Sequence, residues 1–165
     1  MTEFNVDKVM TRALRRLRHD WEKTELETTD DEGRIEESEC WAIIAEGQAV
    51  IVDFDPDSME FEVATLPIEF DYEEAGIDGA LGMLGVAEAV MECLRGVHCV
   101  EINTVYLGAE SAQCSLSYGF RWYSEAALRR DLEVGVEALL QAVSRLGECC
   151  NKSFEAFADL ESSSP

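Results

Sequence analysis

The sequence predicts an α+β fold built from a helix, a three-stranded antiparallel meander, a central helix, a β-hairpin and a C-terminal helix. Three observations predict it. Apolar residues recur every three or four positions in three segments, which is the period of an amphipathic helix. Between these segments, short runs alternate apolar and polar residues, which is the period of a strand. Turn-forming Gly, Pro, Asp and Ser separate the first strands, and short turns favour antiparallel pairing.

Length and composition predict one folded domain. The chain has 165 residues, of which 47% are hydrophobic, so it is long enough and apolar enough to bury a core. We expect a single α+β domain over residues 1–149. Residues 150–165 are expected to form a C-terminal extension that is partly helical and then frayed.

The charge of the chain limits its partners. Acidic residues number 35 against 13 basic ones, for a formal net charge of −22. Such a field repels nucleic-acid phosphates and anionic lipid, so neither is an expected partner. A basic or amphipathic polypeptide is the electrostatically favoured partner, although high charge also serves solubility alone.

The sequence contains neither a signal peptide nor a membrane-spanning apolar run, so we expect a cytoplasmic protein. In that compartment its six cysteines are expected to be free thiols. Cys93, Cys99 and Cys114 stand at apolar positions and are predicted to be buried. Cys149 and Cys150 are the two that would react if they are exposed.

The first segment, Phe4 to about Thr28, predicts an amphipathic helix. Its apolar stripe consists of Val6, Met10, Ala13, Leu17 and Trp21. The only basic cluster of the chain crowds its middle and consists of Arg12, Arg15, Arg16, Arg18 and His19. This cluster is either a solvated helix face or an anchor for an acidic segment.

An acidic loop, residues 28–39, leads into the predicted meander. Its strands are Cys40–Ala45, Ala49–Phe54 and Met59–Thr65. The turn Asp55-Pro56-Asp57-Ser58 is strong, because proline presets one torsion and aspartates bond the local backbone. Alternation along the third strand places Met59, Phe61 and Val63 on the core face.

The central helix is predicted over Tyr72 to Gly96, with an apolar stripe formed by Ile77, Leu81, Leu84, Val90, Met91 and Leu94. Glycines fall every third residue at Gly76, Gly79, Gly82 and Gly85, and each interior glycine costs a helix about 1 kcal/mol. One explanation is a late helix start near Gly82 with Asp78 as N-cap. The other is a ridge of small residues that a second backbone approaches closely.

After this helix the pattern returns to strands. Cys99–Leu107 predicts a strand with Val100, Ile102 and Thr104 on one face. Gln113–Tyr123 is the clearest strand, and its predicted inward residues are Cys114, Leu116, Tyr118, Phe120 and Trp122, opposite Gln113, Ser115, Ser117 and Arg121. Ser124 is a natural N-cap for a last helix from Glu125 to about Leu146, which Gly147 is expected to end. Phe154, Phe157 and Leu160 suggest a further short helix.

The chain carries no motif for catalysis, metal binding or phosphate binding. His98 and Cys99 are adjacent, so on a strand they would point to opposite faces, and no C-x-x-C pattern occurs. The glycine-rich phosphate-binding patterns are also missing. We therefore expect a protein that is not an enzyme, with no catalytic residue, no metal and no cofactor.

The element order, and the run EINTVYLGAE followed by CSLSYGFRWYSEAALRRDLEVGVEALLQAV, resemble the type III secretion chaperone fold. Class I effector chaperones and YbjN-type regulators share that fold. The resemblance covers about Phe4 to Leu146. It implies a homodimer with the central helix and the adjoining hairpin at the interface. It also implies that the first helix and first sheet present apolar surface to an extended partner.

We therefore expect a non-enzymatic, chaperone-like protein-binding module that holds an extended segment of a partner polypeptide. The predicted partner-binding residues are Val6, Met10, Leu17, Trp21, Trp41, Met59 and Phe61. The predicted dimer interface consists of Gly79, Gly82, Gly85 and Ala89. Two alternatives remain: a YbjN-like regulatory or stress protein of the same fold, and a small ligand-binding domain or enzyme using a pocket between sheet and helix.

Overall fold

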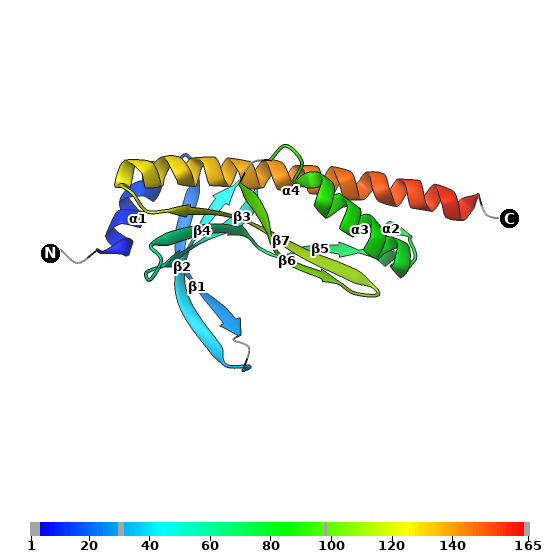
Figure 1. The fold of residues 1–165 in the computed structure, drawn as a ribbon, viewed down its shortest axis with the longest axis horizontal. Coiled ribbons are helices and arrows are strands. Elements are labelled where there is room, and N and C mark those ends of the chain that lie inside the picture. The colour runs from blue at the N-terminus through cyan, green and yellow to red at the C-terminus, as the bar shows by residue number, and fades with distance from the viewer. Residues whose placement is uncertain (1–3, 30–31, 98, 164–165) are drawn as a thin grey trace. The chain divides into compact units, whose positions relative to one another are not determined.

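The computed structural model describes residues 4–29, 32–97 and 99–163, and it confirms the predicted α+β class (Figure 1). The elements are α1 (Val6–Leu14), β1 (Asp20–Thr29), β2 (Ile35–Ala45), β3 (Gln48–Asp55), β4 (Glu60–Thr65), β5 (Ile68–Asp71), α2 (Tyr72–Ala75), α3 (Gly79–Cys93), β6 (Val100–Leu107), β7 (Ser111–Arg121) and α4 (Glu125–Ser162). They form two compact units. The first unit comprises Met1–Ala64 and Gly119–Val136, and the second comprises Thr65–Tyr118 and Glu137–Pro165.

In the first unit β1, β2, β3 and β4 are neighbours in that order, and the pairs β1–β2 and β2–β3 are antiparallel. Strand β7 follows β4 in the order, and its residues from Gly119 onward belong to this unit. The predicted meander corresponds to β2, β3 and β4. In β4, Phe61 and Val63 are buried while Glu60 and Glu62 are exposed, as the alternation predicts. Met59 lies just before the strand, in a left-handed conformation with φ of 58°. Strands β1 and β2 extend away from the rest of this unit (Figure 1).

The first predicted helix was too long. Helix α1 ends at Leu14, capped by Arg15, and residues 20–29 form β1 instead. Consequently Leu17 lies in the connecting turn and Trp21 lies on a strand. The reason is tertiary, because β1 pairs with β2 along its whole length, from Asp20 opposite Ile44 to Thr29 opposite Ile35. That ladder outweighs the helical spacing, and the Thr and Trp residues of β1 favour a strand.

Five aromatic rings pack together in the first unit. Phe61 of β4 stacks on Phe120 of β7 with ring centroids 5.5 Å apart, and Phe54 of β3 lies 4.6 Å from Phe61. Phe4 covers the cluster, with its centroid 4.9 Å from that of Trp122. Such aromatic pairs add to the free energy gained from burying their area. The cluster therefore ties the start of the chain to β3 and to Trp122, which directly follows β7.

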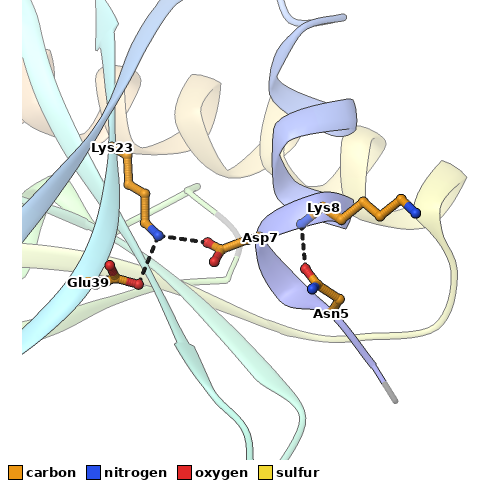
Figure 2. A network of polar contacts seen from close by, with 5 residues as sticks. All are labelled: Asn5, Asp7, Lys8, Lys23 and Glu39. Carbon is orange, nitrogen blue, oxygen red and sulfur yellow. Dashed lines mark hydrogen bonds and ion pairs between the residues drawn. The ribbon is translucent and has the colours of Figure 1, made fainter. Parts of the chain in front are cut away.

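An exposed ion-pair network joins α1 to the first hairpin (Figure 2). The Nζ atom of Lys23 on β1 lies 3.0 Å from Asp7 of α1 and 2.8 Å from Glu39 of β2. Hydrogen bonds to Glu39 and then Asp7 raise the pKa of Lys23 above its ordinary value. Asn5 caps the helix by accepting a 2.9 Å hydrogen bond from the Lys8 N–H. Because the ion pairs are exposed, they orient α1 more than they stabilise the fold.

In the second unit, β7 pairs antiparallel with β5 and also with β6. The short strand β5 was not predicted from the sequence. Its four residues give too short a run for periodicity to detect, and Pro67 directly precedes it. The β5–β7 pairing, from Ile68 opposite Cys114 to Asp71 opposite Ser111, makes it a strand.

The predicted central helix is two helices. Helix α2 is a single turn capped by Asp71, and it ends at Gly76, which takes a left-handed conformation with φ of 70°. Helix α3 begins at Gly79, and its N-cap is Asp78, as predicted, which accepts a hydrogen bond from the Ala80 N–H. The helix therefore starts three residues before Gly82, and Gly79, Gly82 and Gly85 lie inside it.

The small residues of α3 are covered within the chain. A Cβ on Gly79 would clash with the backbone carbonyl of Ala109, and one on Gly82 would clash with the ring of Tyr72. Gly85 lies against Phe154 and Phe157 of α4, and Ala89 is buried. The close approach expected along the ridge thus exists, but the approaching groups belong to the same chain. Homodimerisation stays a prediction, and the glycines of α3 do not support it because they are covered by residues of the same chain.

The last helix does not end at Gly147. Helix α4 begins after the predicted N-cap Ser124, whose Oγ accepts a hydrogen bond from the Ala127 N–H, and continues to Ser162. Its buried stripe consists of Leu128, Leu132, Val136, Leu139, Ala142, Leu146 and Cys150. Beyond Gly147, Phe154 and Phe157 pack against Gly85 of α3. This packing outweighs the cost of one interior glycine, about 1 kcal/mol.

The alternation of buried and exposed residues predicted for β7 is found at both ends of the strand but not in its middle. Cys114 and Leu116 are buried, and Gln113 and Arg121 are exposed, as predicted. However, Ser115 and Ser117 are buried as well. The Ser115 hydroxyl is satisfied by a 2.6 Å hydrogen bond with the hydroxyl of Thr104 on β6. A neighbouring strand with a matching polar group thus allows serine at this buried position.

Candidate functional site

Strand β6, in the second unit, has a free edge. Among the described strands it pairs with β7 alone, from Val100 opposite Tyr118 to Leu107 opposite Ala112. Its other side therefore presents unpaired main-chain N–H and C=O groups. Such an edge is a template on which another strand can add. Figure 1 shows β6 beside β7.

A β-bulge decides which way the side chains of β6 point. The register shifts between Ile102 and Thr104, so that Asn103 has no partner on β7. After the shift, Val105 lies opposite Cys114 and Leu107 opposite Ala112, whereas Thr104 lies opposite Ser115. Directly opposed side chains share one face of the sheet. The predicted set of Val100, Ile102 and Thr104 on one face is therefore wrong at Thr104, because the bulge turns the strand by one residue.

The bulge produces an apolar row along this edge. Ile102, Val105 and Leu107 share the face of buried Leu116, Cys114 and Ala112, yet they are 37%, 46% and 36% exposed. Tyr106, on the other face, is 63% exposed. Edge strands are usually protected by lysine, proline or inward-pointing charge. The only charged residue of β6 is Glu101, near its start, so the row from Ile102 to Leu107 has no such protection.

A groove between α3 and α4 provides a second apolar surface in the same unit. Its volume is about 580 Å³, and its lining residues are Ala87, Glu88, Ala89, Met91, Glu92, Arg95, Cys149, Lys152 and Ser153. Met91 is largely exposed. Arg95 and Glu92, which both line the groove, form an ion pair 2.9 Å long. The groove combines small and apolar side chains with charges of both signs.

The residues predicted to bind a partner do not form one exposed surface. Met10, Trp41 and Phe61 are buried in the core. The remaining four are half-buried: Val6, Leu17, Trp21 and Met59. The exposed apolar row on β6 was missed, because alternation in VEINTVYL gives no sign of the bulge. The signal present in the sequence is the absence of Lys, Arg and Pro from this strand.

All six cysteines are free, and they differ in exposure. Cys93 and Cys114 are buried as predicted, and Cys40 and Cys150 are buried too. Burial raises the pKa of Cys93 and of Cys114 to about 11, and that of Cys150 to about 12. Cys99 is exposed, contrary to prediction, because it lies before β6 in a left-handed turn with φ of 65°. Cys149 is half-buried at the α3–α4 groove.

The described residues contain no group of three or more His, Cys, Asp or Glu side chains placed to hold a metal ion. His98, considered with Cys99 as a ligand pair, lies outside the described residues. The Tyr72 hydroxyl is buried and has no hydrogen-bond partner within the part of the chain that is described. Burial raises the pKa of this phenol, which therefore stays protonated.

None of the helices in the described ranges is both long and apolar enough to cross a membrane. Comparison of the chain with family models, with curated proteins and with solved structures finds no significant match.

Proposed function

We propose that this protein is a non-enzymatic protein-binding module, and that the β6 edge holds an extended segment of a partner polypeptide. The observation that carries the proposal is the uncovered apolar row Ile102, Val105 and Leu107 on a strand with a free main-chain edge. The partner adds a strand to the sheet. Its main-chain groups pair with β6, and alternate side chains pack on the apolar row.

The nature of the partner follows from charge. The net charge of −22 favours a basic or amphipathic segment and slows the approach of acidic ones. Main-chain pairing supplies affinity that depends little on sequence, and the apolar row selects β-branched or aromatic side chains at alternate positions. The resemblance to cytoplasmic secretion chaperones supports the same class of activity, with the difference that the partner uses β6 rather than the first helix and first sheet.

Strand addition is tested with peptides of about eight residues, the length of β6. Peptides are selected from a random library on the immobilised full chain, and the tightest is then measured in solution. Val105→Lys should abolish its binding, because a charge enters the apolar row. The matched control is Val134→Lys, since Val134 is 47% exposed on helix α4. Equal binding by wild type and Val105→Lys contradicts the proposal.

Main-chain pairing is tested separately by N-methylation, which removes a single peptide N–H donor. In an antiparallel or parallel added strand, only alternate N–H groups face β6. Methylation of the N–H groups that face β6, which are either the odd or the even positions of the peptide, should therefore abolish binding. Methylation at the alternate positions should leave the affinity nearly unchanged. Equal sensitivity at every position would show that the peptide does not bind as a strand.

The predicted homodimer is compatible with this proposal if a second copy uses the same edge. Sedimentation of the wild type and of Val105→Lys distinguishes the cases. If the wild type is a dimer and Val105→Lys is a monomer, the second copy binds at β6. If the wild type is a monomer, the partner that binds at the β6 edge is a different polypeptide.

A further inference from the structure

Three arginines meet in one depression of the first unit, although the chain as a whole is strongly acidic. The depression has a volume of about 290 Å³ and is lined by Arg12, Ala13, Arg16, Glu125, Ala126 and Arg129. Arg12 belongs to α1, Arg16 to the turn that follows α1, and Arg129 to the first turns of α4. The sequence shows the arginine run after residue 11, but only the fold adds Arg129 to it.

The charges in this depression do not cancel. Arg12 is engaged by Glu125, with Nη1 and Oε2 3.5 Å apart. Arg16 and Arg129 are exposed, and neither has a carboxylate partner among the described residues. Two positive charges therefore remain uncompensated at one place, in a protein with a net charge of −22. Arg15 stands next to Arg16 in sequence and adds to the local positive potential, whereas Arg130 is paired with Asp131 at 3.0 Å.

The residue type and the neighbouring helix both favour an oxyanion. The cluster contains arginine and no lysine, and the planar guanidinium pairs with phosphate or carboxylate through two parallel hydrogen bonds. Ala126, in the first turn of α4, also lines the depression. The partial positive charge of a helix N-terminus adds to the attraction for an anion.

We propose that this arginine depression binds the dianionic phosphate group of a phosphate monoester. The guanidinium groups of Arg16 and Arg129 carry two positive charges, which a phosphate dianion would neutralise. A single carboxylate would neutralise only one of them, as Glu125 does for Arg12. The small volume fits a compact group. A long acidic segment is disfavoured, because most of its length would lie against a surface dominated by acidic residues. The group can be carried by a small metabolite or by a phosphorylated side chain of a partner.

The test is titration of the full chain with phosphoserine and with inorganic phosphate, followed by NMR or calorimetry at low salt. Arg16→Gln and Arg129→Gln should each weaken binding about tenfold or more, since each removes a charge-assisted contact. Arg95→Gln is the control, because Arg95 is an exposed arginine of the second unit, and it should leave the affinity unchanged. Circular dichroism confirms that each variant is folded. Absence of binding, or equal weakening by Arg95→Gln, overturns the proposal.

The charge of the ligand provides an independent check. The second pKa of a phosphate monoester is about 6, so binding should strengthen as the pH rises from 5 to 7.5 and the dianion forms. Sulfate is a dianion throughout this range and should bind with little pH dependence. A peptide with phosphoserine should bind more tightly than the same peptide with serine if a modified side chain is the source. Tighter binding of a glutamate-rich peptide than of phosphoserine also overturns the proposal.

Discussion

Gly85 of α3 lies directly against the ring of Phe154 of α4: a Cβ at position 85 would stand 3.0 Å from Cε1 of that ring. Phe157 lies next to it, 3.2 Å from the same Cβ position. The glycine thus provides the space that two aromatic side chains of the C-terminal part of α4 occupy. Figure 1 shows α3 running alongside this part of α4. The residues after Gly147 therefore contribute to the packing of the second unit.

Two glycine-to-alanine substitutions should have opposite effects on stability. Gly82→Ala forces a methyl group into the buried ring of Tyr72 and should cost about 1–3 kcal/mol of unfolding free energy. Gly147→Ala is the matched control, because no atom lies within 4 Å of its Cβ position and it is interior to α4. It should stabilise the protein by up to about 1 kcal/mol. Urea unfolding measures both, and stabilisation by Gly82→Ala would contradict the packing described.

Thr65→Val should destabilise the second unit. The Thr65 Oγ1 atom accepts a 3.0 Å hydrogen bond from the buried Leu116 N–H. Valine has nearly the same shape but no acceptor, so the N–H is left unsatisfied at a cost of about 1–3 kcal/mol. Thr65→Ser keeps the acceptor and should cost clearly less. If the two variants unfold at the same urea concentration, the hydrogen bond contributes nothing.

The exposure of the six thiols predicts two reactivity classes. Cys99 is exposed and Cys149 is half-buried, so these two should be labelled first by a thiol reagent on the native protein. Buried Cys40, Cys93, Cys114 and Cys150 should react only after denaturation. Peptide mapping of the labelled chain identifies the sites. Rapid labelling of Cys93 or Cys114 in the native state would contradict the structure.

Alkaline pH should destabilise the protein through its buried thiols. The folded pKa of Cys93 and of Cys114 is about 11, against an ordinary value of 9.0. Below pH 9 both states keep the proton, so stability is unaffected. As the pH rises from 9 towards 11, these thiols lose their protons mainly in the unfolded chain. This difference lowers the free energy of unfolding by about 2–3 kcal/mol for each thiol.

The measurement for this prediction is urea unfolding at pH 8 and pH 11. Tyrosine and lysine also titrate in this range, so the informative quantity is the difference between variants. Cys93→Ala should lose less stability between the two pH values than the wild type does. Cys99→Ser, which removes an exposed thiol, should lose the same amount as the wild type.

Features that depend on neighbouring residues in the chain were predictable from the sequence. Asp78 and Ser124 cap α3 and α4 as expected, because a cap needs only its own side chain and the next N–H groups. The core face of β4 and the outer ends of β7 followed from alternation, which the strand geometry imposes locally. The α+β class followed from the order of these local patterns.

Features that depend on distant residues were decided by the tertiary structure. Trp21 fits the stripe of a helix, yet it lies on β1 because β2 offers a full-length ladder. Gly147 should end a helix, yet α4 continues because Phe154 and Phe157 pack on Gly85. The exposed row on β6 depends on a bulge that only pairing with β7 defines. At Trp21 and Gly147 a local preference of about 1 kcal/mol or less is outweighed by contacts between segments far apart in the sequence. In all three cases the deciding contacts are ones that the local pattern of residues does not encode.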